Sequence, residues 1–367
     1  MRKTNENSSD SSNLKKCEAR LYFGTYTSYS QSAGIYVYAI SEEGKLRKIS
    51  TCGDCENPSY LAMGAGVLYS SDEIDGKGRI SSYAIGNDGC LTRIGSSEFT
   101  GSGLCHISIW PNGQWISGAN YNEGSFTTCE IIPDRSVGKV SHSFTGDATG
   151  VDPLRQQKQH AHCIVASPDG RIMAAADLGG ERLYLFDTNI HTGELSLRAN
   201  QPWVETKPGE GPRHFVFSGD GMFGYLLTEM GNSIYIYSID NNGYFKEIQI
   251  VSTLPSGNKV RSAAAAIKIS PDGRYIYASN RGADNIVCYA IAKDGALSEP
   301  SFYPAHGRAP RDFCLSPCGR FAVITNQDSG DVFVVKRDID NGTLGEVTDT
   351  TKIPQVSCVI WVLKNLT

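Results

Sequence analysis

The phrase Ser-Pro-Asp-Gly-Arg occurs at residues 167–171 and again at residues 270–274. Weaker copies follow the same plan, and they stand at residues 63–66, 110–113, 218–221 and 316–320. Short runs of β-branched and aromatic residues flank each copy, so each copy predicts a tight turn between two strands. The copies recur at intervals of roughly 45 to 57 residues, which is typical of the blades of a β-propeller.

A second repeated pattern sets the number of blades. It reads as a strand, a turn rich in Asp, Asn and Gly, and another strand, and it begins seven times, at Gly34, Arg79, Ser125, Arg182, Ser233, Asn285 and Asp331. An apolar strand precedes each turn phrase, at residues 59–63, 106–110, 162–166, 214–218, 265–269 and 312–316. We therefore predict an all-β chain folded as a seven-bladed β-propeller with four-stranded blades.

The seventh apolar strand stands at the C-terminus, at residues 357–361. If it joins the strands at 20–26 and 34–40, the N- and C-terminal strands share one blade and close the ring. A closed ring leaves no unpaired sheet edge at the join. We expect a single propeller domain over residues 19–367, preceded by a disordered polar tail at residues 1–18.

The composition argues against several classes of partner. A net charge of −5 does not favour nucleic acid or an anionic membrane as the main partner. The chain has no apolar run of about 18 residues, and its first residues lack the apolar centre of a signal peptide. We expect a cytoplasmic protein that is a monomer or a weak homodimer.

The eleven cysteines are odd in number and occupy unrelated positions in the blades. We expect them to act as small core residues in a reducing compartment. Cys52 and Cys55 form a C-x-x-C pair with no second pair at zinc spacing, so a structural role is favoured over a metal or redox site. The sequence predicts no metal and no cofactor.

Polar residues gather where each innermost strand begins and each second strand ends. These two positions lie at the same end of a hairpin, so seven blades bring them to one mouth of the central channel. Buried polar groups cost desolvation unless they are solvated, paired or bound to a ligand. The mouth is therefore a candidate site, although single members can serve only the blade. The strand starts supply Asn57, Ser59, His106, His160, His162, Arg213, Arg311 and Asp312, and the strand ends supply Asp72, Glu73, Asn120, Tyr121, Asp177, Glu229, Asn280, Arg281, Asn326 and Gln327.

The mouth contains the groups that a hydrolase of small esters needs. His160 and His162 are two residues apart and are expected to point the same way along an extended strand. They lack an evident third metal ligand, so we favour a histidine that activates water. Arg213 and Arg281 can hold a carboxylate, a phosphate or a developing oxyanion. Glu229 has three possible roles: orienting the base, acting as the base, or forming an ion pair.

No familiar nucleophile or phosphate motif competes with this site. The chain has no G-x-S-x-G elbow, no Walker loop and no G-x-G-x-x-G between a strand and a helix. A propeller that only binds a protein would need a large exposed apolar patch, and the sequence shows none that can be placed. The polar channel favours a small ligand.

The chain resembles the lactonase family of seven-bladed propellers over nearly everything after residue 20. The matching segments, in order, include GTYT at 24–27, NPSY at 57–60, HAHC at 160–163, GPRHFVFSGDG at 211–221, SPDGRYIYASNRGADNIVCY at 270–289 and APRDFCLSPCGRFAVITNQDSGDVFVV at 309–335. The family includes the propeller-type bacterial 6-phosphogluconolactonase and, more remotely, the fungal carboxymuconate cyclase. The resemblance implies hydrolysis of 6-phospho-D-glucono-1,5-lactone in the pentose phosphate pathway, with a small-molecule lactone as the partner.

The resemblance also implies a set of site residues. The cyclase branch has a proposed catalytic set of one His, two Arg and one Glu, which match His162, Arg213, Arg281 and Glu229. The remaining candidates for substrate binding are His106, Asn120, His160, Arg311, Asp312 and Asn326.

One position departs from the family. Members commonly carry a Glu before the fifth turn, where this chain has Ala266 in the segment Ala-Ala-Ala-Ile-Lys. A carboxylate lost near the mouth would alter substrate preference, so lactone hydrolysis is better supported than the phosphorylated substrate. The alternatives are a lactonase or cycloisomerase for another lactone, such as a carboxymuconate-type substrate, and a non-catalytic binding propeller.

Overall fold

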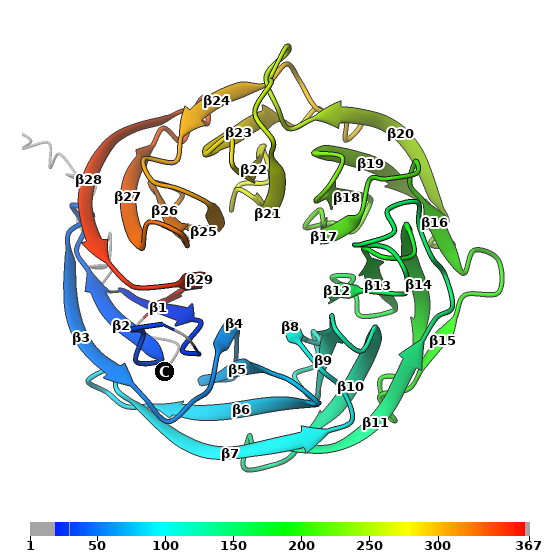
Figure 1. The fold of residues 1–367 in the computed structure, drawn as a ribbon, viewed down its shortest axis with the longest axis horizontal. Helices are drawn as coiled ribbons and strands as arrows, with labels where there is room; N and C mark the ends of the chain where they lie inside the picture. The colour runs from blue at the N-terminus through cyan, green and yellow to red at the C-terminus, as the bar shows by residue number, and fades with distance from the viewer. Residues whose placement is uncertain (1–18, 29, 364–367) are drawn as a thin grey trace, which may run out of the picture.

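The computed structural model describes residues 19–28 and 30–363, and within that part of the chain all regular structure is β-strand. Seven sheets stand around a central axis like the blades of a propeller (Figure 1). The predicted fold class and the number of blades are confirmed. The tail predicted at residues 1–18 lies outside the described residues. The described part contains no helix long and apolar enough to cross a membrane.

The strands take four positions between the axis and the rim. The innermost strands are β4 (Pro58–Gly64), β8 (Leu104–Ile109), β12 (Ala161–Ala166), β17 (Pro212–Phe217), β21 (Ala263–Ile269), β25 (Pro310–Leu315) and β29 (Val356–Leu363). The second strands are β1 (Ala19–Thr25), β5 (Val67–Ile74), β9 (Trp115–Asn120), β13 (Ile172–Asp177), β18 (Phe223–Thr228), β22 (Tyr275–Arg281) and β26 (Phe321–Asn326).

The third strands and the outer strands complete each blade. The third strands are β2 (Ile35–Ile40), β6 (Lys77–Ile85), β10 (Ser125–Ile131), β14 (Arg182–Thr188), β19 (Ser233–Ile239), β23 (Asn285–Ala290) and β27 (Asp331–Arg337). The outer strands are β3 (Leu46–Cys52), β7 (Leu91–Phe99), β11 (Val137–Thr145), β15 (Leu195–Leu197), β16 (Trp203–Glu205), β20 (Phe245–Ser252), β24 (Ser301–Pro304) and β28 (Leu344–Lys352).

One blade departs from the four-strand plan. Its outer position is filled by two short strands, β15 and β16, which both pair with β14. The interruption contains Pro202, which has no backbone N–H to donate to the ladder. The Pro202 carbonyl still accepts a hydrogen bond from the Leu185 N–H at 2.9 Å, and pairing resumes at Trp203.

The Ser-Pro-Asp-Gly phrase forms the turn between the innermost and second strands. At the copy that follows β12, the Asp169 carboxylate accepts hydrogen bonds from the Ser167 hydroxyl at 2.6 Å and from the Arg171 N–H at 3.1 Å. Gly170 has a φ of +72°, a conformation that residues with a Cβ rarely adopt. The phrase recurs because six of the seven blades need the same reversal of the chain, whereas β29 and β1 of the closing blade are not joined by a turn.

The ring closes as predicted, because β1 pairs with β2 on one side and with β29 on the other. Figure 1 shows the red C-terminal strand beside the blue N-terminal blade. Side chains of this shared blade pack against the neighbouring blade in one apolar cluster, which includes Leu21, Val356, Val323 and Val334. Similar clusters fill the other junctions between blades, so the core is continuous around the ring.

A charge buried in the closing strand should destabilise the whole ring. Val356 is fully buried in β29, whereas Val260 lies in a loop and is 56% exposed. We expect Val356→Asp to lower the free energy of unfolding by at least about 3 kcal/mol, because a carboxylate would be desolvated without a partner. We expect Val260→Asp to change it by less than about 0.5 kcal/mol. Urea unfolding of both variants tests this, and equal stabilities would contradict closure by β29.

Candidate active site

A β-bulge near the start of every innermost strand shapes one mouth of the channel. In each blade the pairing with the second strand shifts, which leaves an extra residue on the innermost strand. Three of these extra residues are His162, Arg213 and Arg311. A bulge redirects a side chain out of the alternation of the strand, and in this way the fold aims these groups at the mouth.

Glu229, which directly follows β18, is the centre of the site. Its Oε1 accepts a hydrogen bond from Arg155 at 2.8 Å, and its Oε2 accepts from Arg213 at 2.8 Å and lies 2.9 Å from an Arg281 nitrogen. The carboxylate side chain is 7% exposed. Three guanidinium groups therefore surround one buried carboxylate, which leaves the cluster with an excess of positive charge.

Electrostatics fix the charge states of this cluster. Burial alone would raise the pKa of Glu229, but Arg281 and Arg213 outweigh it and hold the pKa well below its usual range. Burial lowers the pKa of Arg281 to about 10, against the opposing effect of Glu229. The carboxylate is therefore ionised, and of the three possible roles the structure shows the ion pair.

His162 lies beside the carboxylate as a neutral imidazole. Burial, and then the charge of Arg213, hold the pKa of His162 well below its usual range. Its Nε2 is 3.8 Å from Glu229 Oε2, which is too long for a hydrogen bond. Its Nδ1 is 3.8 Å from Cys105 Sγ. The structure thus brings together His162, Arg213, Glu229 and Arg281, as the sequence predicted.

The rings of His160 and His162 both lie against the ring of Tyr121. His160 precedes β12 and His162 is the extra residue of its bulge, so the alternation of an extended strand does not relate them. The His160 ring stacks on Tyr121 with centroids 4.5 Å apart, and its Nδ1 lies 2.9 Å from the Tyr121 carbonyl oxygen. The Tyr121 and His162 rings are nearly perpendicular with centroids 5.6 Å apart, and the Tyr121 hydroxyl accepts a hydrogen bond from Arg155 at 3.2 Å.

Further rings lie around the channel next to His162. The His214 ring lies 5.5 Å from both His162 and His106, and His106 packs on Tyr60 at 4.4 Å. Burial lowers the pKa of His106 to about 3, and it lowers that of His214 well below the usual range. His106 thus lies among aromatic side chains and is uncharged at neutral pH.

Two charged residues form a separate pair near these rings. Lys268 Nζ lies 3.3 Å from Asp312 Oδ1, and Asp312 Oδ2 accepts a hydrogen bond from the Val359 N–H at 3.1 Å. Burial opposes the charge of Lys268, but Asp312 outweighs it and raises the lysine pKa. Asp312 therefore neutralises Lys268 and ties β25 to β29.

The structure does not bring Asn120 and Asn326 to the site. Both side chains are fully buried inside their blades. Asn120 Nδ2 donates to the Ser125 hydroxyl and the Thr127 hydroxyl, both at 3.1 Å. Asn326 Nδ2 donates to the Ala305 and Asp331 carbonyl oxygens at 3.0 and 3.2 Å. An amide at the end of a second strand serves to satisfy nearby polar groups of its blade.

Ala266 lies in the bulge of β21, next to Ala265, whose carbonyl oxygen accepts a hydrogen bond from Arg213. Ala266 is fully buried and belongs to the apolar cluster that contains Phe313 and Ala322. The effect of losing an acid at this position on substrate preference stays a prediction.

Arg155 is the main residue that the sequence analysis missed. It lies between β11 and β12, in a segment where Asp152 accepts hydrogen bonds from the Leu154 and Arg155 N–H groups at 2.8 and 3.0 Å. Every connection from an outer strand to the next innermost strand ends at the mouth. The long, partly basic loop at residues 146–160 is thus the feature of the sequence that points to Arg155.

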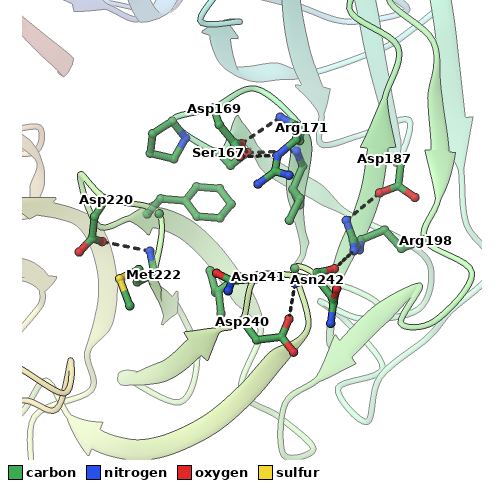
Figure 2. Close-up of a pocket in the computed structure, with 16 residues that line it drawn as sticks. Ser167, Asp169, Arg171, Asp187, Arg198, Asp220, Met222, Asp240, Asn241 and Asn242 are labelled. Carbon is green, nitrogen blue, oxygen red and sulfur yellow. Dashed lines mark hydrogen bonds and ion pairs between the residues drawn. The ribbon is translucent and has the colours of Figure 1, made fainter.

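Other features of the surface do not compete with this mouth. The described residues contain no group of three His, Cys, Asp or Glu side chains that could hold a metal ion. A hollow of about 430 Å3 lies at the opposite face, among the turns of two blades (Figure 2). Its charged groups are engaged locally: Arg198 pairs with Asp187 at 2.6 Å, and Asp240 accepts from the Asn242 N–H at 2.8 Å. These contacts indicate a structural role.

Comparison with known proteins agrees with this geometry. The model of the family described as lactonase, seven-bladed β-propeller, matches residues 20–361. The chain belongs to this lactonase family. Its membership makes it a lactone-hydrolysing enzyme by class, and it confirms the resemblance noted in the sequence.

Relatives of this lactonase carry more specific names. A 6-phosphogluconolactonase of Bacillus subtilis is 31% identical over 92% of this chain and 97% of its own length. The crystal structure of a putative 6-phosphogluconolactonase from Bacteroides fragilis is 30% identical, with a TM-score of 0.88 over 96% of this chain and all of that one. A periplasmic gluconolactonase of Pseudomonas aeruginosa is also 30% identical, with a TM-score of 0.88 over 94% of this chain and 99% of that one.

The buried histidines should make this lactonase less stable in mild acid. The pKa of His106 in the folded protein lies below its unfolded value near 6.5. The contribution of the neutral ring to the free energy of unfolding is therefore complete above pH 6.5 and is lost as the pH falls. We expect wild type to lose about 1.4 kcal/mol more stability than His106→Gln between pH 7.5 and 5.5. Urea unfolding at both pH values measures this difference. The effects of the other titrating groups are the same in both proteins and therefore cancel.

His191 provides the control, because it is exposed on a turn. His191→Gln should lose as much stability as wild type between the two pH values. If His106→Gln behaves in the same way, His106 is not buried in its neutral form.

Proposed function

We propose that the protein hydrolyses an anionic sugar lactone, with 6-phospho-D-glucono-1,5-lactone as the first candidate. The observation that carries this proposal is the excess of positive charge around Glu229 beside a neutral imidazole. Arg281 and Arg155 have side chains that are 20% and 42% exposed, so their guanidinium groups can meet a ligand while Arg213 stays buried. Guanidinium groups suit phosphate and carboxylate, because each offers two parallel donors.

The proposed reaction uses groups that are already in place. His162 accepts a proton as the water oxygen adds to the lactone carbonyl carbon. Arg281 stabilises the negative charge that develops on the carbonyl oxygen, and Glu229 holds the guanidinium groups in position. The bond between the carbonyl carbon and the ring oxygen then breaks, and the ring oxygen takes the proton from His162. The product is the open hydroxy acid.

The names of the relatives support this substrate. Two relatives that match nearly the whole chain are named for 6-phosphogluconolactone, and one is named for a gluconolactone. A lactone of this kind carries an anionic phosphate or several hydroxyl groups, and the charged mouth provides partners for both.

Loss of either reacting group should reduce turnover strongly. We expect His162→Gln and Arg281→Ala to lower kcat/KM for 6-phosphogluconolactone at least about a hundredfold, the scale of losing one general base or one oxyanion donor. Arg171→Ala, whose side chain is 77% exposed on the opposite face, is the matched control and should leave the rate unchanged. The rates can be followed by acid release at constant pH. Wild-type rates in the first two variants would contradict the proposal.

Arg155 should select for anionic lactones. We expect Arg155→Ala to lower kcat/KM for 6-phosphogluconolactone by about 10- to 100-fold, the scale of one charged hydrogen bond. The rate with uncharged glucono-1,5-lactone should change little. A carboxymuconate-type lactone in the same panel tests the alternative substrate. Equal losses with charged and uncharged lactones would show that Arg155 only supports Glu229.

We also propose that the protein works in the reducing cytoplasm. The ten cysteines that the structure describes are all free, and six of them are buried among core side chains. This pattern fits small core residues better than a disulfide framework.

A further inference from the structure

A second polar cluster lies at the mouth, apart from the Glu229 cluster. It comprises Tyr26, Ser59, Glu73, Arg311 and Gln327, and we call it the Glu73 cluster. All of its members except Ser59 line a cleft of about 750 Å3. Arg311 lies close enough to the Glu229 cluster to affect the pKa of both Arg281 and His162. Arg311 is the extra residue of its bulge in β25, as His162 and Arg213 are in β12 and β17, so both clusters face the same mouth.

Glu73 keeps one oxygen available. The Tyr26 hydroxyl donates to its Oε2 at 2.8 Å, and the Ser59 hydroxyl donates to the same oxygen at 2.6 Å. Among the residues described, none donates a hydrogen bond to Oε1, and no Lys or Arg forms an ion pair with this carboxylate. A carboxylate oxygen in this state accepts hydrogen bonds from hydroxyl groups.

Arg311 holds the tyrosine in place without pairing with Glu73. Its guanidinium donates to the Tyr26 hydroxyl at 2.7 Å and to Gln327 Oε1 at 3.2 Å, and it lies 5.2 Å from the centre of the Tyr26 ring. Because the Tyr26 hydroxyl accepts from Arg311, its own proton points to Glu73. The hydroxyl bridges the two charges and fixes the orientation of the carboxylate.

The charge of the cleft differs from that of the Glu229 cluster. Three acidic residues line it, Glu56, Glu73 and Asp75, against two basic ones, Lys77 and Arg311. An anionic group would be repelled there, whereas hydroxyl groups would find acceptors. The two clusters therefore offer complementary chemistry at one mouth.

We propose that the Glu73 cluster is a second subsite, which binds the hydroxyl-bearing part of the lactone while the arginines around Glu229 bind its anionic or carbonyl oxygens. This inference rests on the proposed function. It makes Glu73 a residue that determines specificity for polyhydroxylated lactones over plain ones. A site built to bind a substrate hydroxyl discriminates strongly against an analogue that lacks it, because its own polar groups are then left unpaired.

The test compares two lactones of the same ring size. Wild type, Glu73→Gln and Tyr26→Phe are assayed with glucono-1,5-lactone and with unsubstituted δ-valerolactone. We expect Glu73→Gln to lower kcat/KM for the hydroxylated lactone by about 10- to 100-fold and to leave that for δ-valerolactone nearly unchanged. Tyr26→Phe keeps the ring beneath Arg311. It should lower the ratio of kcat/KM for glucono-1,5-lactone to kcat/KM for δ-valerolactone by a smaller factor. Glu346→Gln, whose side chain is 71% exposed, is the matched control.

The outcomes separate this inference from the proposed function. If wild type hydrolyses neither lactone nor the phosphorylated one, the proposed function fails and the subsite falls with it. If wild type is active but Glu73→Gln and Tyr26→Phe leave the ratio of the two rates unchanged, only the subsite is overturned. Equal losses with both lactones would also overturn it, because they would show a purely structural role.

Discussion

The pairing of β1 with β29 joins the first described strand to the last, and the arrangement of the site depends on it. Without this pair, β1 and β29 would each present a row of unpaired backbone groups, and the ring could open. With it, seven innermost strands stand around one axis (Figure 1). Residues from distant parts of the chain, such as His162 and Arg281, can then meet at one mouth.

The bulges determine which side chains of the innermost strands reach the mouth. A regular ladder would direct alternate side chains of each innermost strand into the junctions between blades, where apolar residues pack. The extra residue at each bulge is free of that alternation, so His162, Arg213 and Arg311 reach the mouth. At the equivalent bulge of β21 the chain has alanines, and Ala266 stays in the apolar core. The same backbone device therefore gives functional groups in some blades and packing in others.

The Glu229 cluster illustrates why a buried charge network marks function rather than stability. Burying ions costs desolvation energy, and attraction between them repays it only in part. One carboxylate for three guanidinium groups leaves positive charge that a bound anion can neutralise. The exposed fractions of the three arginine side chains fit this role. Arg213 is almost fully buried beside Glu229, and Arg155 is the most exposed and can meet a ligand. The Glu73 cluster complements the Glu229 cluster with a carboxylate that forms no ion pair with any Lys or Arg in the described part of the chain.

The sequence by itself determined the number of blades, the place of each strand and the closure of the ring, because turn phrases and strand periodicity are local properties of the chain. It also placed His162, Arg213, Glu229 and Arg281 at one mouth, because position within a repeat determines position around the axis. Only the tertiary structure decided which side chains face the channel. The register shift in β12 made His162 the extra residue of its strand, hydrogen bonds within the blades withdrew Asn120 and Asn326, and a loop brought in Arg155. The ion pair of Arg155 with Glu229 joins residues far apart in the chain, and the hydrogen bonds of the two asparagines depend on the exact register of a hairpin. The repeat pattern encodes neither.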